Sequence, residues 1–173
     1  MADAQRIVVL GFDTREGAQE ALDALLRLQR EGKLLLRDAV FVQKDADGKR
    51  AHVEQTMDQS TGTAALGGAF WGLLFGVILL VPIAGIAIGA GTAALVAKLT
   101  DVGLSDKFVK QVRESIKPGK TYLALLVSHA NPEAVLAELR RFQGIAELVD
   151  SNMPEEAVQQ VKDALTQTAP AKT

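Results

Sequence analysis

The sequence predicts an α+β fold, a ferredoxin-like βαβ–βαβ sandwich interrupted by an apolar glycine-zipper helical hairpin. Two segments, one near each end of the chain, share the order strand, capped helix, strand. Between them lies a run without any charged side chain, from Gln59 to Ala97. Two β-α-β units of this size form a four-stranded sheet covered on one face by two helices. The strands of one unit must then pair with those of the other, and the second face of the sheet stays open.

The first unit begins with "RIVVLGF", Arg6–Phe12, whose β-branched residues indicate a buried strand. Asp13 is expected to cap the next helix, with Glu16 three residues on, and Gly32 to end it. A second strand, "LLLRDAVFVQKD", leads through the hairpin turn Asp45–Gly48 into "KRAHVEQT". The helix has one apolar face, made of Ala18, Ala21, Leu22, Leu25, Leu26 and Leu28.

The second unit follows an amphipathic helix, "LSDKFVKQVRESIKPG", with Ser105 as its candidate cap and Pro118-Gly119 as its stop. "KTYLALLVSHANPEAVLAELRRFQGIAELVD" then reads as strand, helix and short strand. Asn131 is the expected cap of that helix and Pro132 its first residue. "MPEEAVQQVKDALTQT" predicts a last helix. The predicted parts are residues 1–56 (first half), 57–100 (hairpin), 101–152 (second half with its preceding helix) and 153–173 (C-terminal helix and tail).

The charge-free run predicts two helical arms, because Pro82 near its centre removes an amide donor and bends the chain. The arms run from Gly62 to Leu80 and from Ile83 to Leu99. Each is about 25–28 Å long at about 1.5 Å per residue, whereas a bilayer core of about 30 Å asks for about 20 residues. The arms are therefore marginal for full crossings and sufficient for a re-entrant hairpin. A sheet shared by both halves puts Thr56 and Thr100 on one side of any bilayer.

Small residues recur four apart in both arms. Such stripes let helix backbones approach closely, so that van der Waals packing holds them together in lipid. The first stripe is Ala64, Gly68, Gly72 and Gly76, and the second is Gly85, Gly89, Ala93 and Ala97. A cluster of lysines and arginine follows the run, which is typical of a cytoplasmic flank: Lys98, Lys107, Lys110, Arg113, Lys117 and Lys120.

Two environments for the hairpin remain open. One is the inner membrane, with both termini cytoplasmic and the hairpins packed against each other. The other is a cytoplasmic, soluble homo-oligomer that gathers the hairpins inside it, since a domain of about 130 residues cannot cover two wholly apolar arms alone. An ion channel is not favoured, because only Thr63 and Thr92 interrupt the apolar surface.

Composition excludes several functions. A net charge of −2 gives no basic surface for nucleic acid. The chain has no cysteine, so disulfides and thiolate metal sites are excluded. "MADAQRIVVLGFD" lacks the basic and apolar regions of a signal peptide, which places the flanks in the cytoplasm.

Several motifs resemble functional sites without their required context. "GAGTAA", Gly89–Ala94, continues a small-residue stripe rather than following a strand, so no dinucleotide site is expected. The loop at Asp45 lacks the full ligand series of a calcium site, and Thr56 stands at its twelfth position. His52 and His129 have no companion at metal-ligand spacing. We therefore expect no catalytic, cofactor-binding or metal residues and no enzymatic activity, and no small-molecule ligand can be identified. A small-molecule enzyme or sensor that uses the open face of the sheet is the least supported alternative.

The ordered series resembles an uncharacterised bacterial family, the domain of unknown function 1269, labelled as predicted membrane proteins. The likeness is carried by "VVLGFDTREGAQEAL", "GGAFWGLLFGVILLVPIAGIAIGAG", "GLSDKFVKQVRESIKPGKTYLALLV" and "NPEAVLAELRRFQG", over about residues 6–165. The resemblance implies a ferredoxin-like domain with a glycine-zipper insertion and a link to the cell envelope or to stress. It supplies no catalytic residues. The expected function is a non-enzymatic, membrane-associated protein that self-associates through the hairpin.

Overall fold

The computed structural model describes residues 6–47, 51–56 and 106–166. The first half of the chain forms β1 (Arg6–Phe12), α1 (Arg15–Arg30), β2 (Leu34–Lys44) and β3 (Ala51–Gln55). The second half forms α4 (Asp106–Ser115), β4 (Thr121–Ala130), α5 (Pro132–Leu139), a 3-10 turn (Arg140–Phe142), β5 (Ala146–Ser151) and α6 (Glu155–Thr166). The predicted hairpin, its stripes, its bend at Pro82 and the Ser105 cap all lie outside the described residues.

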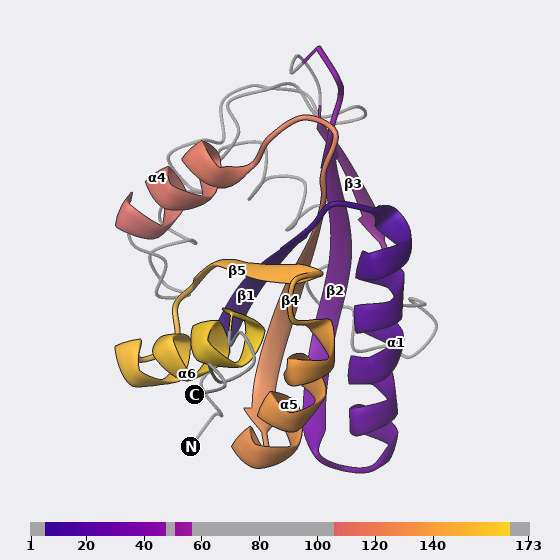
Figure 1. The fold of residues 1–173 in the computed structure, drawn as a ribbon, viewed down its shortest axis with the longest axis vertical. Coiled ribbons are helices and arrows are strands. Elements are labelled where there is room, and N and C mark those ends of the chain that lie inside the picture. The colour runs from indigo at the N-terminus through magenta and orange to yellow at the C-terminus, as the bar shows by residue number, and fades with distance from the viewer. Residues whose placement is uncertain (1–5, 48–50, 57–105, 167–173) are drawn as a thin grey trace, which may run out of the picture.

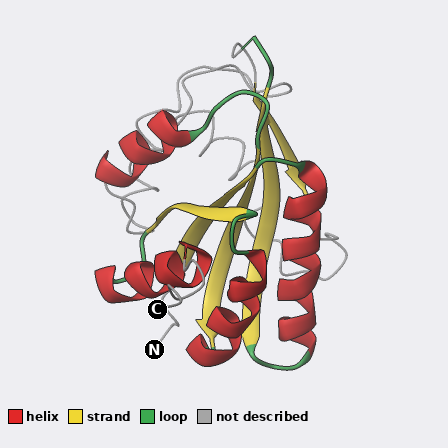
Figure 2. Ribbon diagram, in the orientation of Figure 1, coloured by secondary structure: helices red, strands yellow, loops and turns green. Residues whose placement is uncertain are grey.

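The strands form one antiparallel sheet in the order β3-β2-β4-β1-β5 (Figure 2). β4 lies between β1 and β2, so a strand from the second half pairs with two strands from the first. The α+β class and the pairing between halves are confirmed. The predicted number of strands is wrong: within the described residues the sheet has five strands rather than four, because β3 pairs with the outer edge of β2, with Lys44 opposite Ala51.

The first face of the sheet carries α1, α5 and α6, which lie side by side in Figure 1 with α5 in the middle. Their apolar faces pack on alternate residues of the strands, as the two-residue period of a strand requires. This core includes Leu10 and Phe12 of β1, Phe41 of β2 and Leu125 of β4. In the part of the chain that the structure describes, three helices cover this face rather than the predicted two, because α6 also contacts β5.

The helix ends agree with most of the predicted signals. Asn131 caps α5 by accepting a hydrogen bond from the Ala134 amide at 3.1 Å, and Pro132 is the first residue, as predicted. Gly32 follows α1 with φ +72°, a conformation that favours glycine. The predicted Asp13 cap is wrong. Thr14 is the cap, because its Oγ1 accepts from the Gly17 amide at 3.1 Å.

The second face of the sheet is also apolar and buried. Its side chains are almost fully inaccessible and belong to β1, β2 and β4: Ile7, Val9, Val40, Val42, Ala124 and Leu126. α4 lies on this side, apart from the other three helices, and packs against β5 (Figure 1). Phe108 and Val112 of α4, and Ile116 directly after it, are buried. The predicted open face is therefore wrong.

Tyr122 fixes the end of α4 to the sheet. Its side chain is 0% exposed, and its hydroxyl donates to the Ser115 carbonyl at 2.9 Å. The same hydroxyl accepts from the Lys117 amide at 2.8 Å. The helix ends at Ser115, three residues before the predicted stop at Pro118-Gly119. One phenol thus satisfies two backbone groups where α4 passes into β4.

We expect Tyr122→Phe to lower the free energy of unfolding by about 1 kcal/mol, because it leaves a partly buried carbonyl and amide without their protein partner. Denaturant unfolding of the purified protein measures this loss. Tyr122→Leu should cost more, since it also removes ring volume. A Tyr122→Phe variant as stable as the parent would show that the two hydrogen bonds contribute nothing.

Candidate functional site

The clearest polar cluster among the described residues joins three strands at one end of the sheet. Lys120, directly before β4, places its Nζ 3.3 Å from Asp13 Oδ1 and 3.4 Å from Glu147 Oε1. Asp13 directly follows β1, and Glu147 lies in β5 opposite Gly11. The pairing of Phe12 with Thr121 brings Asp13 and Lys120 together. The cluster therefore follows from strand register rather than from a local motif.

Lys120 is held in its charged form. Partial burial acts to lower the pKa of Lys120, but the hydrogen bond to Asp13 and the negative charges of Glu147 and Asp13 outweigh it. The pKa therefore lies above its ordinary value of 10.5. A lysine acting as nucleophile or general base needs the opposite shift, toward neutral pH. The chemistry available to this lysine is ion pairing.

Gly11 lets the groups around it approach closely. A Cβ at this position would lie 3.1 Å from Glu147 Oε1 and 3.2 Å from the Tyr122 ring. β1 therefore presents bare backbone to Glu147 and Tyr122. The cluster borders a hollow of about 560 Å³, which the turn at Gly144 and the end of α6 also line.

A smaller cavity, of about 160 Å³, lies on the first face of the sheet. It is lined mostly by apolar side chains of β1, β4, α1, α5 and α6, with His129 among its lining residues. His129 is exposed. The cavity brings no set of polar groups toward one point.

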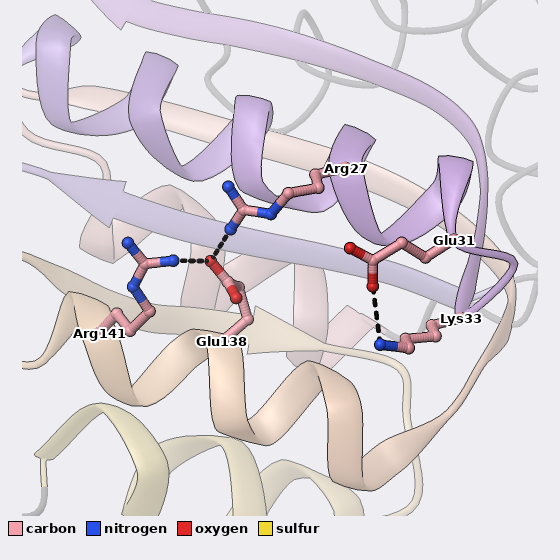
Figure 3. Close-up of polar contacts among 5 residues, drawn as sticks. All are labelled: Arg27, Glu31, Lys33, Glu138 and Arg141. Carbon is pink, nitrogen blue, oxygen red and sulfur yellow. Dashed lines mark hydrogen bonds and ion pairs between the residues drawn. The ribbon is translucent and has the colours of Figure 1, made fainter.

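An ion-pair network joins α1 to α5 on the first face (Figure 3). Glu138 Oε1 accepts from Arg27 and, at 2.8 Å, from Arg141. The Glu138 side chain is 14% exposed, so its charge is better shielded from water than those of its partners. The Glu31–Lys33 pair, at 2.7 Å, lies at the exposed turn into β2. These contacts fix helices and a turn in place.

The two histidines take no part in a metal site within the described residues. His52 Nε2 lies 2.8 Å from Asp45 Oδ1 at the hairpin between β2 and β3. No group of three or more potential ligands that could hold a metal ion occurs in residues 6–47, 51–56 and 106–166. In the same ranges, none of the helices has the length and hydropathy needed to cross a bilayer.

Sequence reasoning missed the role of Lys120, which it grouped with the basic residues after the charge-free run. The signal was present in part: Asp13 directly follows one predicted strand, and Lys120 directly precedes another. Only the observed antiparallel register between β1 and β4 makes them neighbours.

The alkaline stability of the protein tests this cluster. Burial raises the pKa of Tyr122 above 10.0, despite the opposing hydrogen bond from Lys117, and the pKa of Lys120 is also raised. Both groups hold their proton more tightly in the folded state. The resulting stabilisation is complete below the unfolded-state pKa values, near pH 10, and is lost as pH rises through the folded-state values.

We therefore expect the free energy of unfolding to fall from about pH 10 upward, and to fall less steeply in Lys120→Met. Denaturant titrations at a series of pH values measure the slope for both proteins. Identical slopes for the parent and Lys120→Met would contradict the assigned ion pairs.

An antiparallel sheet with helices on both sides, divided in sequence by an apolar insertion, defines a mixed α/β protein. The family described as "Protein of unknown function (DUF1269)" matches residues 65–166, more than half of the chain. The chain belongs to this family, which confirms the resemblance. No curated protein and no solved structure matches it.

Proposed function

We propose that this protein is a non-enzymatic, membrane-associated protein that self-associates through the glycine-zipper hairpin of residues 62–99. Both termini lie in the cytoplasm, and the fold is a ferredoxin-like sandwich with one added edge strand and a helical insertion. The packing residues are the small-residue stripes Ala64, Gly68, Gly72, Gly76, Gly85, Gly89, Ala93 and Ala97, with the bend at Pro82. The family resemblance adds an envelope- or stress-linked role.

The observation that carries this proposal is the pairing of β2 with β4 across the insertion, with Val40 opposite Ala124. Because one rigid sheet holds both flanks, the insertion leaves and re-enters the same domain. It then crosses a bilayer an even number of times or not at all. A two-armed hairpin meets this condition, whereas a single span does not.

The absence of enzymatic activity is part of the proposal. Lys120 is paired with two carboxylates that keep it protonated. Tyr122, the other buried titratable group near it, uses its hydroxyl to hold the end of α4. These contacts support a structural role for the most polar end of the sheet.

The experiment is to replace Gly72 with leucine. The larger side chain prevents the close approach of two helices that a small-residue stripe permits. We expect Gly72→Leu to reduce the oligomer size of the detergent-extracted protein and to leave the circular dichroism of the α/β domain unchanged. Phe70→Leu, on the opposite side of the arm, is the matched control and should keep the parent's size. An unchanged oligomer in Gly72→Leu would overturn the proposed role of the stripes.

The second candidate is a soluble homo-oligomeric scaffold with the hairpins buried inside it. The length and apolar character of residues 62–99 favour it, because a domain of about 130 residues cannot cover two wholly apolar arms alone. Fractionation separates the two candidates. Release from membranes only by detergent supports insertion, and a large soluble particle supports the scaffold.

A further inference from the structure

The second face of the sheet needs more cover than α4 provides. α4 has ten residues, so it is about 15 Å long and about 10 Å wide. Neighbouring strands lie about 4.8 Å apart, so β2 lies about 14 Å from β5, against which α4 packs. Val40 and Val42 of β2 are nevertheless 0% exposed. α4 packs against β5, and Tyr122 holds its end over β4, so a helix of this size leaves much of the β2 side of the face, including Val40, for another part of the chain to cover.

The two ends of the insertion lie toward opposite edges of the sheet. Thr56 is tied to β2, because its amide and its Oγ1 both donate to the Ala39 carbonyl, at 3.2 and 2.8 Å. The chain resumes with α4 against β5, at the other edge. Between these points the insertion must travel about 14–19 Å across the strands.

Only one face offers a short path. α1, α5 and α6 occupy the first face from β2 to β5, so a chain crossing there would have to pass outside them. The second face presents apolar side chains along the same line, among them Val40, Ala124 and Leu126. An apolar, charge-free stretch of chain fits that surface, and residues 59–97 are such a stretch.

From this geometry we propose that part of residues 57–105 crosses the second face of the sheet and covers the apolar side chains of β1, β2 and β4. The insertion docks on the domain that carries it. A crossing of about 19 Å takes about 13 residues of helix. Of the 39 charge-free residues 59–97, that leaves about 26, or two arms of about 13. Arms of that length reach about 20 Å, which is enough for a re-entrant hairpin or for packing in a soluble assembly and too short for full crossings.

The test uses the full-length chain, which has no cysteine of its own. Val40→Cys places a thiol on the second face, and a second cysteine is introduced at successive positions of residues 57–105. Cysteine is a small, readily buried side chain, so Val40→Cys should fold. Ala39→Cys is the matched control, because Ala39 is the preceding residue of β2 and belongs to the first-face core.

After mild oxidation, we expect at least one pair with Val40→Cys to lose both free thiols and to form a disulfide within a single chain. It would run at monomer mass on a non-reducing gel. The same partners should not link to Ala39→Cys. Disulfides found only at dimer mass would mean that a second copy covers the face. No disulfide at any position would mean that the insertion does not lie on the face. Either result overturns the proposal. The readout does not depend on membrane binding, so it can succeed where the proposed function fails.

Discussion

Replacing Phe12 with alanine should lower the free energy of unfolding by about 3–5 kcal/mol. Phe12 is 1% exposed and belongs to the core beneath α1, α5 and α6. The change removes a buried ring and leaves a cavity, because the sheet and the helices packed on it cannot move to fill the space. Denaturant unfolding followed by circular dichroism measures the loss.

Phe12→Leu is the matched control, since it keeps most of the apolar volume and should cost less than about 1.5 kcal/mol. If Phe12→Ala and Phe12→Leu unfold at the same denaturant concentration, the ring does not lie in a close-packed core. That result would contradict the described packing of the first face.

Replacing Leu126 with alanine should cost about 2–5 kcal/mol, although Leu126 lies on the face that the sequence predicts to be open. Leu126 is 1% exposed and stands between Asp38 and Ile7 of the neighbouring strands. A leucine on an open face would lose little on truncation. The size of the decrease in the free energy of unfolding therefore shows whether the second face belongs to the hydrophobic core.

Leu35→Ala is the comparison for that measurement. Leu35 is also a leucine in the sheet, but it is 38% exposed, and substitutions at exposed positions usually change stability by about 0.5 kcal/mol or less. Equal, small losses for Leu126→Ala and Leu35→Ala would mean that the second face is not covered in solution.

The elements of the described domain could be predicted from local sequence because each carries its own signals. Asn131 followed by Pro132 marks the start of α5, and Gly32 marks the end of α1. The Asp13 cap failed because Thr14, one residue later, offers an equivalent acceptor. Spacing alone does not decide between adjacent capping residues.

The sheet was predictable in its pairing but not in its extent. The repeated β-α-β plan requires strands of the two halves to alternate, and β4 does lie between β1 and β2. The edge strand β3 follows a correctly predicted hairpin, but the predicted sandwich left it out of the sheet. Burial of the second face depends on what packs there, which local periodicity does not show.

The polar cluster could not be predicted because its members are distant in sequence. Asp13, Lys120 and Glu147 meet only through the register of β1 with β4 and β5. In the sequence, Lys120 is one of several basic residues after the apolar run. In the structure, Lys120 pairs with two carboxylates, and no sequence motif links these residues to Lys120.

The central claim is that one domain holds both flanks of the apolar insertion and that the insertion enters a membrane from that side. Single cysteines at Glu54→Cys, before the insertion, and Lys110→Cys, after it, test this directly in a chain without native thiols. Spheroplasts are treated with a membrane-impermeant maleimide before and after lysis. We predict that both thiols are protected in intact spheroplasts and labelled after lysis, in protein that pellets with the membrane. Labelling of one thiol but not the other in intact spheroplasts would place the flanks on opposite sides and contradict the account.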